Sequence, residues 1–108
     1  MLKEEMARCL LSGIYYPISA VAAIGKDKSV LSVALFDTEF GCLPAVTADP
    51  EEIWLFTNHP EGRRTLYEKD QVHISRIRAL YPGIPLRVLI TNEDFVCFEY
   101  ALFLPGEV

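Results

Sequence analysis

Apolar side chains recur along this chain with two different periods. At the amino-terminal end Leu2, Met6 and Leu10 fall on one face of a helix, while charged side chains occupy the other positions. Residues 2–12 are therefore expected to form a short amphipathic helix, and Gly13 is expected to end it.

The chemistry of the chain changes after this segment. Residues 14–24 and 29–36 are rich in apolar side chains, and the polar turn 25–28 separates them. This pattern predicts a β-hairpin. The alanine-rich residues 19–25 leave a helix as the alternative at this point.

The middle of the chain contains one predicted strand and one ambiguous segment. Residues 37–50 are prone to turns, residues 52–57 form an apolar strand, and residues 58–62 form a compact reversal. Residues 63–80 match neither period outright, because part of this segment alternates like a strand and part shows helical spacing. Both assignments stay open for this segment.

The last quarter of the chain predicts a second hairpin. Residues 81–85 contain two prolines and a glycine and interrupt whatever precedes them, and residues 86–91 then form a strand. A turn at 92–94 leads into a final strand over 95–104. Because residues 95–98 are apolar on both faces, this strand is expected to be central in the sheet or covered by a partner.

Together these elements predict an α+β protein. Its expected architecture is a small antiparallel β-barrel or sheet with an N-terminal helix and one further helix. With 108 residues the chain is expected to form a single domain, 1–108.

Composition narrows the classes of partner. A formal net charge of −5 disfavours DNA and RNA, and no apolar stretch approaches the length needed to span a bilayer. Three cysteines are an odd number without metal-ligand spacing, which favours reduced thiols and a cytoplasmic location. Because 51% of the residues are hydrophobic, part of the surface is expected to be covered in a homodimer.

One group of side chains has the composition of an anion site. Thr57 and Asn58 end the strand 52–57, and Arg63 and Arg64 follow one turn later. Two guanidinium groups, a hydroxyl and the amides of a turn can converge on one phosphate. The alternative is a surface hairpin whose charged tip serves solubility.

The order of these elements over residues 2–75 resembles the flavin-binding split barrels of the pyridoxamine-phosphate-oxidase-like superfamily. The similarity includes a strand that ends in Phe-Thr-Asn and a basic residue a few positions later. The resemblance implies a flavin cofactor, FMN, bound by Thr57, Asn58, Arg63 and Arg64, and a second subunit that contacts the flavin ring. It also implies an oxidoreductase, in which the flavin supplies the chemistry.

No catalytic signature accompanies this resemblance. His59 and His73 are candidate general bases and the cysteines are candidate nucleophiles, but the sequence pairs none of them. His59, which precedes a proline, is interpreted as a turn residue.

A function of another class is a non-enzymatic acidic protein-interaction module, which would regulate or inhibit a partner by binding its basic surface. The acidic residues expected to form the contact face are Glu4, Glu5, Asp49, Glu51, Glu52, Glu93, Asp94 and Glu107.

Overall fold

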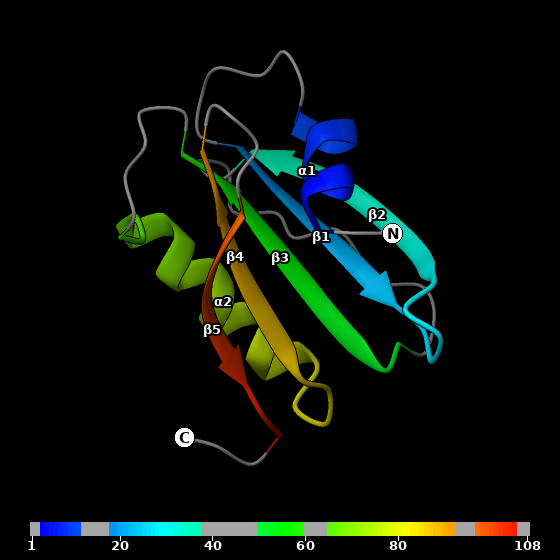
Figure 1. The fold of residues 1–108 in the computed structure, drawn as a ribbon. Helices are drawn as coiled ribbons and strands as arrows, with labels where there is room; N and C mark the ends of the chain where they lie inside the picture. The colour runs from blue at the N-terminus through cyan, green and yellow to red at the C-terminus, as the bar shows by residue number, and fades with distance from the viewer. Residues whose placement is uncertain (1–2, 12–17, 38–49, 60–64, 93–96, 106–108) are drawn as a thin grey trace.

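In the part of the chain that the structure describes, five strands form one sheet with a helix on each face (Figure 1). This computed structural model describes residues 3–11, 18–37, 50–59, 65–92 and 97–105. In chain order the elements are α1 (Lys3–Leu11), β1 (Ile18–Ile24), β2 (Val30–Asp37), β3 (Glu52–Asn58), α2 (Glu68–Leu80), β4 (Leu86–Thr91) and β5 (Cys97–Phe103). The strand order is β2-β1-β3-β4-β5, so β2 and β5 are the edge strands.

The first hairpin and the N-terminal helix are confirmed. β1 and β2 pair antiparallel, and the turn between them is closed by the Gly25 N–H, which donates to the Ser29 carbonyl at 2.8 Å. Lys28 has a φ of 59°, a left-handed conformation that tight turns require. The helical alternative for residues 19–25 is wrong, because β1 is paired on both sides and this pairing overrides the helix propensity of alanine.

The ambiguous segment 63–80 contains α2, and this helix determines the direction of the next strand. The chain leaves β3, passes through α2 and returns as β4 in the same direction, so β3 and β4 pair parallel. The other three strand pairs are antiparallel. The α+β class and the sheet with two helices are confirmed, and the single parallel pair makes the sheet mixed rather than wholly antiparallel.

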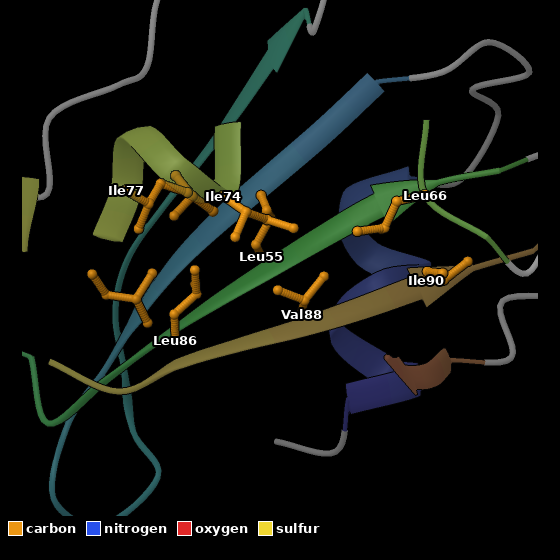
Figure 2. Packing of buried hydrophobic residues seen from close by; sticks show 9 residues of the cluster. Leu55, Leu66, Ile74, Ile77, Leu86, Val88 and Ile90 are labelled. Atoms are coloured by element: carbon orange, nitrogen blue, oxygen red, sulfur yellow. The ribbon is translucent and has the colours of Figure 1, made fainter. Parts of the chain in front are cut away.

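The two faces of the sheet bury separate apolar clusters. The α2 face is filled by the cluster of side chains drawn in Figure 2, namely Val21, Ile53, Leu55, Leu66, Ile74, Ile77, Leu86, Val88 and Ile90. The α1 face is filled by Met6, Ala7, Leu11, Ala20, Ala22, Ile24, Trp54, Phe56 and Leu89. Successive residues of β3 contribute to opposite clusters, as the alternation of side chains along a strand requires.

Helix α1 covers the central strands but leaves one edge open. Ala20 and Ala22 of β1 are small, so α1 can lie close to the sheet at this point. On β2 a row of larger apolar side chains stays exposed by 38–45%, and we call it the β2 stripe: Val30, Leu31, Val33 and Leu35. The last strand is also an edge, so the central position expected for it is wrong for β5. The alternative, a covering partner, stays a prediction.

Candidate functional site

Two of the sequence-predicted site residues lie at the carboxyl end of β3. Thr57 and Asn58 are both buried, with 1% and 3% of their surface exposed. As successive residues of a strand they point to opposite faces of the sheet, so the strand does not direct their side chains to one ligand. Arg63 and Arg64 lie outside the described residues.

A buried polar network joins this end of β3 to the start of α2. The Thr57 Oγ1 lies 2.9 Å from the His59 Nε2, and the same nitrogen lies 3.0 Å from the Asp70 Oδ2. All three side chains are at most 2% exposed. Because an ionised carboxylate only accepts hydrogen bonds, Nε2 carries the hydrogen and donates it toward Asp70.

Asp70 and Tyr67 fix the first turn of α2 against this histidine. The Asp70 Oδ2 also accepts the Tyr67 backbone N–H at 3.0 Å, and a carboxylate in the first turn of a helix is stabilised by the helix dipole. The Tyr67 ring lies on the His59 ring, with centroids 4.4 Å apart and a tilt of 52°. The backbone N–H of His59 donates to the backbone carbonyl of Thr91 at 2.8 Å, which connects the network to β4.

The interpretation of His59 as a turn residue stays a prediction, because most of the reversal 58–62 lies outside the described residues, but its side chain is fully buried and bonded. Thr57 and Asp70 share one ring nitrogen of His59. The arrangement therefore holds β3, β4 and α2 together. Nothing in the sequence alone pairs His59 with Asp70, since the pairing depends on the helical assignment of residues 63–80.

An open hollow lies on the outer side of the same helix start. It has a volume of about 440 Å³ and is lined by Tyr67, Glu68, Lys69 and Val72. The Lys69 Nζ lies 5.7 Å from the centre of the Tyr67 ring, within the range of a cation–π contact. The hollow is thus lined by an aromatic ring and a cation, next to the acidic Glu68.

A second polar network spans the opposite end of the sheet, on the α1 face. Glu52 is 9% exposed and accepts hydrogen bonds from the Arg87 Nε at 2.5 Å and the Trp54 Nε1 at 2.9 Å. Lys28 of the hairpin turn lies 3.3 Å from its other oxygen, and Arg87 also pairs with Glu99 of β5. Glu52 therefore connects strands and does not belong to an exposed acidic face, contrary to the expectation from sequence.

The partners of Glu52 determine its ionisation. Burial alone would raise the pKa of this carboxyl group, but the hydrogen bonds from Arg87, Trp54 and Lys28 outweigh it and lower the pKa below its ordinary value. A glutamate with a lowered pKa in the folded state stabilises the fold when it is ionised.

The described part of the chain contains neither a candidate metal site nor a candidate membrane-spanning helix. No three or more His, Cys, Asp or Glu side chains there are grouped to hold a metal ion, and neither helix is long and apolar enough to cross a membrane. No family model, curated protein or solved structure matches the chain. The resemblance to the flavin-binding split barrels and the FMN site stay predictions.

We predict that Asp70→Ala lowers the free energy of unfolding by about 1–3 kcal/mol, because the His59 ring and the Tyr67 N–H lose their common acceptor inside the protein. Urea unfolding followed by circular dichroism measures this loss. Glu68→Ala, on the exposed side of the same helical turn, is the matched control and should change stability by less than about 0.5 kcal/mol. Equal effects of the two substitutions would contradict the structural role of the network.

The lowered pKa of Glu52 predicts that the protein loses stability in acid. Since its pKa is lowered on folding, its contribution is complete above the ordinary glutamate pKa and disappears as the pH falls through the lowered value. Glu52→Gln should therefore be less stable than the wild type near neutral pH and lose less stability on acidification. Unfolding curves measured from neutral pH down to below the lowered pKa of Glu52 test this difference, with the exposed Glu51→Gln as control. Coincident pH profiles for wild type and Glu52→Gln would refute the assignment.

Proposed function

We propose that this chain is a non-enzymatic protein-interaction module that binds its partners through its edge strands. The observation that carries the proposal is the distribution of exposed apolar side chains. Four form the β2 stripe, and three more, Tyr100, Leu102 and Leu104, lie on or just beyond β5, with 39–48% of their surface exposed. Rows of apolar side chains beside unpaired strand edges are typical of surfaces that other chains cover.

The charge of the chain supports the same class of function. A net charge of −5 attracts basic partner surfaces over long range, and Glu5 and Glu51 are exposed among the described residues. Such a module would regulate or inhibit the partner whose surface it covers. A cytoplasmic location, which the odd number of cysteines favours, is part of the proposal.

Co-purification tests the proposal. The tagged chain is recovered from the cells that express it, and the proteins recovered with it are quantified by mass spectrometry. We expect Val33→Lys or Leu102→Lys to reduce at least one specific protein about tenfold or more, because a desolvated lysine in a contact costs more than the roughly 1.4 kcal/mol that a tenfold change requires.

The matched control is Leu80→Lys, which places the same charge at an exposed apolar position of α2 and not on an edge strand. It should leave the recovered proteins unchanged. The proposal fails if both edge-strand variants recover the same proteins in the same amounts as the wild type.

As the second candidate we keep a flavin-binding split-barrel protein with FMN-dependent oxidoreductase activity. The observation that favours it is the hollow beside Tyr67 and Lys69, whose volume of about 440 Å³ falls within the range of small-molecule sites. The Tyr67 ring that lines it contacts His59, which directly follows β3 of the parallel pair β3 and β4. Sheets of α/β proteins commonly bind ligands at the carboxyl ends of such strands.

Added FMN distinguishes this candidate. Under the flavin hypothesis FMN should raise the midpoint of thermal unfolding, and the double substitution Arg63→Ala and Arg64→Ala should abolish that rise because the phosphate loses its cations. Lys26→Ala, at an exposed position of the hairpin turn, is the control. A colourless purified protein whose unfolding midpoint does not respond to FMN would eliminate the candidate.

A further inference from the structure

We infer that the open edge of β2 pairs antiparallel with β2 of a second copy of this chain, about a two-fold axis at Val33. The inference rests on the proposed function, since it takes the β2 stripe as a contact surface and names the chain that covers it. It specifies the partner and the register of the contact.

The outer edge of β2 is built to accept another strand. It has no strand partner among the described residues, and its pairing with β1 is regular from Ser32 to Asp37 after an irregularity at its start. No charged or proline residue occurs from 30 to 36, although such residues are the usual protection of an exposed edge.

The other edge strand differs in these respects. β5 carries the charged Glu99 in its middle, paired with Arg87, and its pairing with β4 is interrupted between Val88 and Leu89. A bulge and a charge in mid-strand are features that prevent edge-to-edge pairing. Of the two edges, β2 is therefore the one suited to backbone hydrogen bonding with another chain (Figure 1).

The side chains of β2 select the register. Val33 and Leu35 pair with Ala22 and Ala20 of β1, so both point to the α1 face. A two-fold axis at Val33 places the two copies of Val33 opposite each other and Leu35 opposite Leu31, the residue that the pairing of β2 with β1 skips. An axis at Ala34 would instead place Leu31 opposite the charged Asp37.

The net charge of the chain and the small area of the β2 stripe limit how a second copy can bind. Two chains of net charge −5 repel each other, so their contact must lie on a neutral part of each chain, and residues 30–36 provide one. The stripe is also self-complementary, as a two-fold contact requires. One strand pair with a single row of side chains buries less than the roughly 1,600 Å² of a standard interface, so we expect a dimer that dissociates on dilution in the micromolar range.

Sedimentation equilibrium of the full-length chain over the micromolar range tests the inference. We expect a monomer–dimer equilibrium that Val33→Lys weakens at least about tenfold, because two ammonium groups would meet at the two-fold axis. Leu35→Lys is a second variant with the same expected direction. Leu102→Lys, on β5, is the matched control and should leave the equilibrium unchanged. Thermal unfolding verifies that each variant is folded.

Salt gives an independent signature of the partner. Added salt screens the repulsion between two chains of charge −5 and should strengthen the homodimer, whereas it should weaken a complex with a basic protein. A mass of one chain at all concentrations overturns the inference, and so does a dimer that Leu102→Lys dissociates and Val33→Lys does not. If the chain is monomeric while Val33→Lys still loses a different co-purifying protein, the self-pairing is overturned and the proposed function stands.

Disulfide trapping tests the register. In a chain whose three native cysteines are replaced by serine, Val33→Cys should form a covalent dimer under mild oxidation, because the two copies of residue 33 face each other. Ala34→Cys should form little, since residue 34 faces residue 32 of the other copy. A dominant Ala34→Cys dimer would overturn the register. If the cysteine-free chain does not fold, the sedimentation measurement still shows whether the chain forms a dimer.

Discussion

All seven residues of β3 are buried, because this strand lies at the centre of the sheet and a different helix covers each of its faces. Ile53 and Leu55 contribute to the α2 cluster, whereas Trp54 and Phe56 contribute to the α1 cluster. A strand in this position needs apolar side chains on both faces and a hydrogen-bonding neighbour on both sides. β1 and β4 supply these neighbours, so the position of every other element follows from β3.

The burial of β3 also explains why polar groups gather at its two ends. Glu52 begins the strand within reach of Arg87 and Trp54, while Thr57 ends it beside His59 and Asp70. Buried charges and hydroxyls are tolerated only when they are paired, and each network supplies the pairs by bridging to other elements. Both networks accordingly fix the arrangement of strands and helices, and the surfaces available to partners lie at the outer strands.

The sequence predicted elements whose signals are local and missed features that depend on pairing. The strand 86–91 was predicted with the bounds of β4, because Val, Ile and Leu are flanked there by a proline and an asparagine. The parallel pairing of β3 and β4 was not predictable while residues 63–80 remained ambiguous, since it follows from the helix α2 between them. The pairing of Glu52 with Arg87 was missed for the same reason, because the two residues become neighbours only in that register.

The candidate site was predicted in part. Thr57 and Asn58 lie at the end of a strand as expected, but the alternation of a strand directs them to opposite faces, and a motif read as consecutive letters does not convey this. The exposure of the β2 stripe also escaped sequence reasoning. Valine and leucine in 30–36 have the same composition as a core strand, and only the position of β2 at the edge shows that their side chains are exposed.

We propose that the neutral edge of β2 is the surface through which this chain associates. Amide hydrogen exchange, measured by mass spectrometry at low and high protein concentration, tests this proposal most directly. Exchange within 32–36 should slow at the high concentration while exchange within 97–103 does not change, because only the β2 amides gain acceptors from another strand. Exchange at β2 that is independent of concentration, with slowing confined to β5, would contradict it.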